Sequence, residues 1–453
     1  MSSDVLMGSL GTLALVLPAL GAMGIALPWL LRVRLEERVI LRITNAVFSL
    51  TFLATLAMDA VFLARGGAPV EFLITDWIAL PAYTVHSAVL LDAPAALMMT
   101  LTGFLAGLIG VFSGNYLHKD PGFHRFFVLL LVFASGMMAV AAGGTLDIIY
   151  AGWEIVGLTS ALLIAYFTYR EAPVRHGLRA FAVYRVCDVA LLGAAILVHH
   201  HSGALTLLHP DALPPESQLL VGGLLIFASM GKGALLPFTG WLPRAMEGPT
   251  PSSAIFYGAL SIHAGPFLLL RGWPYLEGLP ALRWILGGLG LATALHASMV
   301  GRVQSDIKTQ LGYASVAQAG VIVIEIAAGF TGVAMIHIFS HAILRAAQLL
   351  RAPAVLHDWF GLAARLGRTP TRHEGYVERH LPAGLRRRAY AFALDRWAID
   401  DFGRLGLRQA RRLLQSLDRV DQRFAARLAG DPAVAAEPAT ASPEGGHLVN
   451  DQA

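Results

Sequence analysis

The chain alternates between long apolar runs and short polar segments that are rich in arginine. Several runs reach about 18 residues or more with few charges, the length that an α-helix needs to cross about 30 Å of hydrocarbon. The pattern therefore predicts an all-α polytopic membrane protein with about eleven transmembrane helices. These are expected near residues 8–31, 41–64, 93–117, 124–143, 146–168, 177–199, 219–240, 252–271, 283–301, 305–328 and 332–352.

Composition supports this class and excludes several others. The 453 residues are 56% hydrophobic and 14% charged, which is too apolar for a soluble domain. With Cys187 as the single cysteine, the chain cannot build an iron–sulfur cluster, a thiolate zinc site or an intrachain disulfide. It also lacks the glycine-rich motifs that bind dinucleotides or phosphates. We therefore expect no cofactor, no metal and no catalytic chemistry in this chain itself.

The basic residues predict an orientation in the membrane. Arginines and lysines gather in the first, third and fifth connections, whereas residues 200–218 contain neither. Basic loops favour the cytoplasmic side, so we expect a multi-pass protein of the cell's inner (cytoplasmic) membrane. Its N-terminus would lie outside and its C-terminus in the cytoplasm. Arg271 and Arg283, which bracket an external connection, depart from this pattern. The net charge of +4 follows from the basic cytoplasmic face, and we expect no binding to nucleic acid.

The C-terminal part differs from the rest in its pattern. Leucine, valine and phenylalanine recur there at three- and four-residue steps opposite a face of arginines, which is typical of an amphipathic helix on a membrane or against a partner. A solvated arginine-rich helix is the alternative. The predicted segments are a transmembrane domain over 1–352, a cytoplasmic connector over 353–387, the amphipathic helix over 388–430 and a disordered tail over 431–453.

One lysine stands out among the apolar runs. Only three of the 34 basic residues are lysines, yet Lys232 lies within the run FASMGKGALLPFTGWLPRAM. Arginine stays charged in essentially any site, whereas a desolvated lysine can release its proton. Pro237 is expected to break the helix beside this lysine, because its ring clashes with the carbonyl of Gly233. With Glu154 in another predicted span, Lys232 suggests a charge-coupled proton site.

Other polar residues also fall within predicted spans. Arg185 and Asp188 are three positions apart and share a helix face. They could form a structural ion pair or relay charge, and the pattern leaves both possibilities open. For His263, a hydrogen bond between helices and a role in proton transfer are both open.

The last two predicted spans carry a second group. Lys308 and Glu325 lie at opposite ends of one span, about 25 Å apart along the helix. His337, His341 and Arg345 follow a four-residue step in the next span, so they form one stripe about 12 Å long.

Four segments carry a resemblance to a known family. WEIVGLTSALLIAYF, RAFAVYRVCD, GKGALLPFTGWLPRAMEGPTPSSA and SDIKTQLGYASVAQ resemble the antiporter-like membrane subunits of respiratory complex I, above all the L subunit. These subunits are similar to the large subunits of Mrp-type sodium/proton antiporters. The resemblance runs from about residue 92 to 352. It implies an antiporter-like fold of paired five-helix repeats, of which this chain has one complete and one truncated unit.

The resemblance also implies roles for individual residues. Lys232 matches the family's pumping lysine on the broken helix, and Glu154 matches the glutamate that modulates it. Arg185 and Asp188 match a pair that relays charge towards a neighbouring subunit.

Further residues match the link between the two halves of the family's proton path. Lys308 matches the lysine that connects the half-channels. His337 and His341 match the connecting histidines, and Glu325 lies in the span before them as a supporting charge.

The chain departs from the family pattern at several positions. Arg244 replaces an aspartate, Tyr257 replaces a histidine and Arg345 replaces a lysine that donates protons. A histidine, His263, lies six residues after Tyr257. After residue 352 nothing resembles the second broken helix of the family.

Three functions are compatible with these features. The first is a proton-conducting subunit of a complex I-like or Mrp-like assembly, working by charge switching between a glutamate and a lysine. The second is the membrane subunit of a DAB-type inorganic-carbon (CO2 or bicarbonate) uptake complex. The third is a structural subunit that does not pump. The expected partners are the lipid bilayer, other membrane subunits, a cytoplasmic partner along the C-terminal helix, and protons or sodium ions.

Overall fold

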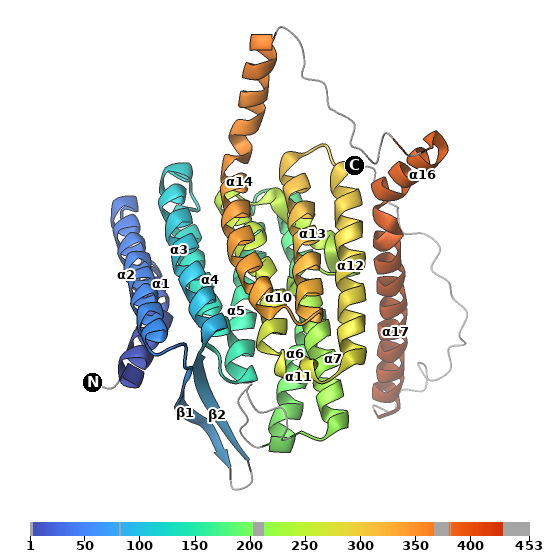
Figure 1. The fold of residues 1–453 in the computed structure, drawn as a ribbon. Coiled ribbons are helices and arrows are strands. Elements are labelled where there is room, and N and C mark those ends of the chain that lie inside the picture. Colours follow the sequence, from blue (N-terminus) through green and yellow to red (C-terminus); the bar gives the residue numbers. More distant parts are fainter. Residues whose placement is uncertain (1–2, 81–82, 203–212, 367–379, 381, 429–453) are drawn as a thin grey trace. The chain divides into compact units, whose positions relative to one another are not determined.

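A computed structural model of the protein describes residues 3–80, 83–202, 213–366, 380 and 382–428. The chain divides into two compact units, Met1–Trp397 and Ala398–Ala453. Each unit is described by itself below, and the first contains all the predicted transmembrane segments (Figure 1).

The first unit consists largely of long apolar helices. Ten helical segments in its described part are long and apolar enough to cross a membrane, which confirms the predicted polytopic architecture. The main helices are α1 (Ser3–Leu30), α2 (Glu37–Ala64), α3 (Ala93–Tyr116), α4 (Phe123–Ala142), α5 (Leu146–Ile164), α6 (Glu171–Ser202), α7 (Pro215–Lys232), α10 (Ser261–Arg271), α12 (Pro280–Arg302), α13 (Ile307–Ala327) and α14 (Thr331–Leu366). Helix α10 is the C-terminal part of the span Thr250–Arg271, and α7, which stops short of the predicted span 219–240, is not among the ten.

Consecutive helices are neighbours through most of this unit. Helices α4, α5, α6 and α7 contact one another in chain order, as do α12, α13 and α14. The segment Thr250–Arg271 is buried along its whole length, whereas only a third of α1 and α2 is buried. Thr250–Arg271 therefore lies in the interior of the unit, while α1 and α2 present apolar side chains outward.

Helix α7 stops abruptly at Lys232, and a run of short turns replaces it. The N–H of Leu235 donates to the carbonyl of Met230, and Ala234 adopts a positive φ of 50°. Pro237 immediately precedes the first of these turns. The turns and short helices are η2 (Phe238–Gly240), α8 (Trp241–Arg244), η3 (Ala245–Glu247), α9 (Thr250–Ser252) and the π-helical η4 (Ser253–Ala259), with α11 (Pro274–Glu277) following α10.

A β-hairpin between α2 and α3 was not predicted from the sequence. Strands β1 (Val70–Leu80) and β2 (Tyr83–Leu91) pair antiparallel, with Val70 opposite Leu91 and Leu80 opposite Tyr83 (Figure 1). The register shifts twice within β1, so the strand has no clean alternation of polar and apolar positions that a sequence pattern would detect.

Arg271 attaches the C-terminal end of α10 to the hairpin and to α3. Its Nη1 donates to both carboxylate oxygens of Asp92, at 2.6 and 2.7 Å, and its Nη2 donates to the carbonyl of Gly143 at 2.6 Å. The side chain is 2% exposed. The departure of Arg271 from the basic-loop pattern thus has a structural reason, because its charge is paired inside the protein.

We expect Arg271→Met to destabilise the protein by about 1.5–3 kcal/mol, because the partly buried Asp92 carboxylate, 21% exposed, loses its charged hydrogen-bond partner. Thermal unfolding of the purified protein in detergent measures the loss. Arg38→Met, at an exposed arginine, is the matched control and should have no effect. The double variant Arg271→Met/Asp92→Asn should recover part of the stability, and equal losses in the single and double variants would contradict this assignment.

The helices towards the C-terminus extend beyond the predicted boundaries. Helix α14 continues past residue 352 to Leu366, into the segment predicted as a connector. Helix α16 (Ala383–Leu394) begins before the predicted position 388, and the turn Arg396–Ala398, with positive φ at all three residues, ends it. The division of the chain at these points remains a prediction, and residues 431–453 lie outside the described residues.

The described part of the second unit is a single helix, α17 (Ile399–Leu428). The apolar stripe predicted for this helix is exposed. This exposure is expected for an amphipathic helix that binds a membrane or a partner through its apolar face. The exposed residues of the stripe are Leu413, Leu417, Val420 and Phe424.

Candidate functional site

Lys232 is the last residue of α7 and its side chain is completely buried. Its ammonium nitrogen lies 4.5 Å from the centre of the Trp153 ring and 4.9 Å from that of the Tyr184 ring. Aromatic faces attract a cation, but they offer it no counter-charge. The lysine therefore depends on a carboxylate for most of its stabilisation as an ion.

Asp188 of α6 supplies that carboxylate. Lys232 Nζ donates to its two oxygens at 3.0 and 3.1 Å. Asp188 also accepts from Trp153 Nε1 at 2.5 Å and from Arg185 Nη2 at 2.8 Å. Arg185 in turn forms an ion pair with Glu154. The four charges thus form a row of alternating sign in the order Glu154, Arg185, Asp188, Lys232.

The row shows how the predicted partners Glu154 and Lys232 are connected. Arg185 and Asp188 lie between them. The outer pair is partly accessible, with 25% of the Glu154 side chain and 36% of the Arg185 side chain exposed, whereas the Asp188 and Lys232 side chains are 2% and 0% exposed. A charge outside the unit could therefore act on the accessible end of the row.

A glycine makes room for the lysine on α5. A Cβ atom added at Gly157 would lie 3.1 Å from Lys232 Nζ and 3.5 Å from the Tyr184 ring. The lysine thus fits against bare backbone, one turn of α5 away from Trp153 and Glu154. Sequence reasoning singled out neither Trp153 nor Tyr184 nor Gly157, although all three lie within the quoted motifs.

The break after Lys232 packs directly against α10. A Cβ added at Gly265 would lie 2.6 Å from the carbonyl oxygen of Ser229 and 2.7 Å from the backbone of Gly233. This contact brings the end of α7 against the helix that carries His263.

We expect Gly265→Ala to destabilise the protein by about 1–3 kcal/mol, because a methyl group there must push two backbones apart. Gly288→Ala in α12, where no atom lies within 4 Å of the added Cβ, is the matched control. It should stabilise the helix by about 0.5–1 kcal/mol. Thermal unfolding of both variants in detergent measures the difference. Equal melting temperatures would contradict the prediction and show that α7 and α10 can move apart at little energetic cost.

His263 joins the predicted histidine stripe of α14. His263 Nε2 lies 3.0 Å from His341 Nδ1, and His341 Nε2 lies 3.3 Å from Arg345 Nη2. Arg345 also donates to Gln348 at 2.8 Å. Of the two interpretations that the sequence left open for His263, the structure shows the hydrogen bond between helices, and this bond places the ring in a connected polar chain.

The other end of the stripe reaches α13. His337 Nδ1 lies 2.9 Å from Glu325 Oε1, and His337 Nε2 lies 3.1 Å from Gln318 Oε1. The ring centres of His337 and His341 are 6.1 Å apart. Glu325, which the sequence alone placed only at one end of its span, is thus a partner of the predicted connecting histidine.

The two remaining candidates lie elsewhere. Tyr257 of η4 donates its hydroxyl to the carbonyl of Ser160 at 3.2 Å. Lys308 lies in the first turn of α13 and belongs to neither cluster. It lines a separate, largely polar cavity of about 620 Å³ next to the broken segment, together with Arg170, Arg244, Glu247 and Asp306.

His296 of α12 was missed by the sequence analysis. It is buried, its Nε2 lies 3.1 Å from Thr239 Oγ1 in the broken segment, and its ring lies 5.1 Å from that of Trp397. An isolated histidine within an apolar run was the only signal in the sequence.

Comparison with known proteins places this architecture in a family. Residues 143–362 match the family model described as NADH:quinone oxidoreductase/Mrp antiporter, transmembrane. Residues 77–127 match the model of the N-terminus of chain 5 of NADH-ubiquinone oxidoreductase (complex I). The chain belongs to this family of antiporter-like membrane subunits. The resemblance inferred from the sequence motifs is confirmed.

Individual proteins similar to this antiporter-like subunit support the same family assignment. NADH-quinone oxidoreductase subunit L of Rhodobacter capsulatus is 31% identical over 367 residues, which cover 76% of this chain and 51% of the relative. NADH-ubiquinone oxidoreductase chain 5 of Cryptococcus neoformans var. grubii is 32% identical over 295 residues, covering 64% of this chain and 45% of the relative. The antiporter-like subunit thus spans about half the length of these curated relatives.

The fold is shared with a solved assembly. A chain in the structure of the Mrp complex from Dietzia sp. DQ12-45-1b superimposes with a TM-score of 0.61 at 22% identity, covering 84% of this antiporter-like subunit and 40% of that chain. At this identity the likeness shows the fold.

Proposed function

We propose that this antiporter-like subunit conducts protons within a multi-subunit membrane complex, and that Lys232 carries the proton. One observation supports the proposal above all others. A completely buried lysine stands at the end of a broken helix, and its counter-ion Asp188 is shared with a second, more accessible cation. A purely structural ion pair would not need this third partner.

The row of charges offers a switching mechanism. When Arg185 turns towards Glu154, Asp188 is left to Lys232 and holds it as an ammonium ion. When Arg185 draws on Asp188 instead, the lysine loses part of its counter-charge, and burial then favours the neutral amine. The ammonium ion thereby gives up one proton and becomes an amine. Net movement requires an acceptor, for which the histidine chain that begins at His263 is the candidate.

We further propose how the other candidates take part. His263, His341 and His337 pass the proton along the stripe of α14, with Arg345 and Glu325 as fixed charges that orient the rings. Lys308, at the wall of a polar cavity, connects this path to the water on one side.

We also propose the setting of the chain in the cell. The subunit lies in the cytoplasmic membrane with its N-terminus outside and its C-terminal helix in the cytoplasm, where the exposed apolar face of α17 binds a partner. The complex would be of the NADH:quinone oxidoreductase or Mrp type, in keeping with the names of its relatives.

Flux in sealed vesicles tests the proposal. The complex, purified through this chain, is reconstituted into vesicles that contain a pH-sensitive dye, and a potassium diffusion potential is imposed. A change of internal pH faster than in protein-free vesicles is expected. Replacement of sodium by choline separates proton from sodium movement. An intact complex without flux would support a structural subunit that does not pump.

A second candidate is inorganic-carbon uptake, and one observation favours it. The cavity beside the broken segment is lined by Arg170, Arg244, Lys308 and Arg396 against two carboxylates, Glu247 and Asp306, and this excess of cations suits a small anion such as bicarbonate. Adding bicarbonate to the same vesicles should then accelerate proton movement. The genes beside this one would separate the candidates further, since a zinc-site partner protein would favour carbon uptake.

A further inference from the structure

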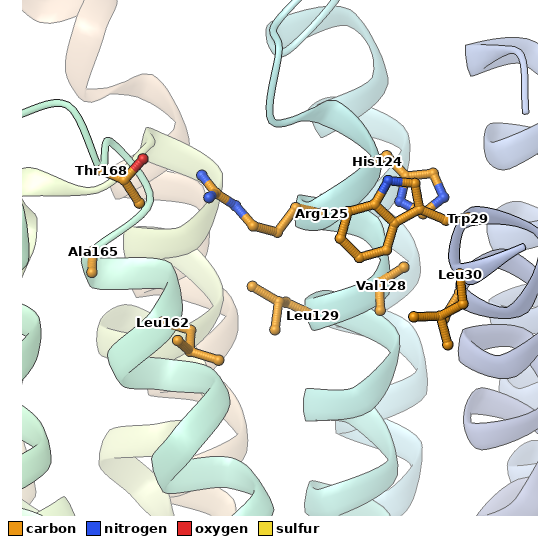
Figure 2. Close-up of a pocket in the computed structure, with 10 residues that line it drawn as sticks. Trp29, Leu30, His124, Arg125, Val128, Leu129, Leu162, Ala165 and Thr168 are labelled. Atoms are coloured by element: carbon orange, nitrogen blue, oxygen red, sulfur yellow. The ribbon is translucent and has the colours of Figure 1, made fainter. Parts of the chain in front are cut away.

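A second cavity lies where the C-terminal ends of α1 and α5 meet the N-terminal end of α4. It measures about 340 Å³ and its wall is almost entirely apolar. Figure 2 shows Leu129 of α4 and Leu162 of α5 facing each other across it, with Leu30 of α1 on the far side. The remaining apolar wall consists of Ala26, Val128 and Ala165.

This cavity adjoins another whose lining is more polar. A neighbouring cavity of about 580 Å³ shares Trp29, His124, Arg125 and Thr168 with it, and adds the polar turn around Asp120. The two together form one amphipathic site with an apolar floor and a polar mouth. Trp29 is 57% exposed at the end of α1, a position that tryptophan favours at the boundary between hydrocarbon and water.

Arg125 is the charged residue that lines both cavities. Its Nη2 donates to the carbonyl of Tyr166, and its guanidinium lies 5.0 Å from the centre of the Tyr166 ring. Its Nε is buried without a hydrogen-bond partner among the described residues. Figure 2 shows the side chain reaching from α4 towards Thr168, across the top of the apolar wall. The guanidinium thus lies at the point where the two cavities meet.

The nearby carboxylate does not neutralise this arginine directly. Asp120 accepts from the Tyr166 hydroxyl at 2.6 Å and from the N–H of Gly122 at 2.7 Å. Burial and the neighbouring Asp120 raise the pKa of the Tyr166 hydroxyl well above its usual value, so it remains a neutral donor. An ammonium group on a ligand could approach Asp120 while an anionic group binds Arg125.

We propose that this site binds a phospholipid, with one acyl chain in the apolar cavity and the phosphate at Arg125. An apolar cavity that ends at a guanidinium matches a molecule with a hydrocarbon chain below an anionic head group. Arginine is suited to phosphate because its planar fork presents parallel donors. The proposal is independent of proton conduction, since none of these residues belongs to the row around Lys232 or to the histidine chain.

Native mass spectrometry of the full chain measures the affinity for the first bound lipid. Dioleoyl phosphatidylglycerol and dioleoylglycerol have the same acyl chains, but only the first has a phosphate. Arg125→Leu should weaken phosphatidylglycerol binding about tenfold, as expected for the loss of a hydrogen bond to a charged group, and leave dioleoylglycerol unaffected. Ala26→Phe, which fills the apolar cavity, should weaken both lipids.

Matched controls test other surfaces of the same helix end. Arg34→Leu removes an exposed arginine just after α1, and Leu27→Phe enlarges a side chain on α1 outside the cavity. Neither should change binding of either lipid. Equal losses for Arg125→Leu and Arg34→Leu would overturn the proposal in favour of general attraction to anionic lipid. Unchanged binding in Ala26→Phe would overturn it too, and would point to a helix of another subunit as the occupant.

Discussion

Lys232→Arg is expected to reduce proton flux by about a hundredfold or more, the range seen when a positioned proton-transfer group is lost. Arginine keeps the positive charge beside Asp188 but does not release a proton at neutral pH. Flux is measured in sealed vesicles with an internal pH dye, and assembly is checked by co-purification of partner subunits. Loss of flux in an assembled complex would identify Lys232 as a proton carrier.

Two controls make this result specific. Lys119→Arg changes a lysine in the connection between α3 and α4 and should leave flux unchanged. Because Gly157 leaves little space around the lysine nitrogen, the larger guanidinium could also disturb packing. Lys232→Met removes the charge without adding width and should lose flux as well. Normal flux in Lys232→Arg would mean that the residue is a structural cation.

The second large effect is expected for Asp188→Asn. This change removes the carboxylate that, among the described residues, pairs with both Arg185 and Lys232, so breaking the buried pair should destabilise the protein by about 3–5 kcal/mol. Lys232 would then stay a neutral amine, because an unpaired buried ammonium ion is energetically costly. Proton flux should therefore disappear, and the melting temperature in detergent should fall.

A double variant separates these two consequences. Asp188→Asn/Lys232→Met removes both buried charges and should restore much of the stability while flux stays absent. Glu154→Gln removes only the outer partner of Arg185, so its effect on both flux and stability should be smaller than that of Asp188→Asn. A larger effect of Glu154→Gln would show that Glu154 acts on Lys232 by a route other than Arg185 and Asp188.

The pattern along the chain was sufficient to predict the spans and the buried lysine. Apolar length determines which segments can cross a membrane, and charges within them are rare enough to be noticed. The partner of Lys232 could not be found in this way. Asp188 lies 44 positions away, and helical spacing only shows that it shares a face with Arg185. Which carboxylate meets the lysine depends on how α6 packs against α7 and α5.

The contact of His263 with His341 and the β-hairpin were also not predictable from spacing along the chain. Helical spacing joined His337, His341 and Arg345, because they lie on one helix. It could not show that His263, from a different helix, contacts His341, since that depends on the π-helical turn η4 and on the close approach of α10 to the broken segment. The hairpin was missed because its register shifts obscure the alternation of a strand.

Helix α14 is longer than a bilayer requires. Its 36 residues extend about 54 Å, whereas the hydrocarbon core is about 30 Å thick. The histidine stripe and the end at Leu366 lie on the same helix, with Pro353 between them. A proline inside a helix removes one backbone hydrogen bond and bends the axis, so the part beyond Pro353 can change its direction while the part that carries His337 and His341 stays packed. Pro353 is thus a hinge that mechanically separates the end of α14 from the histidine stripe.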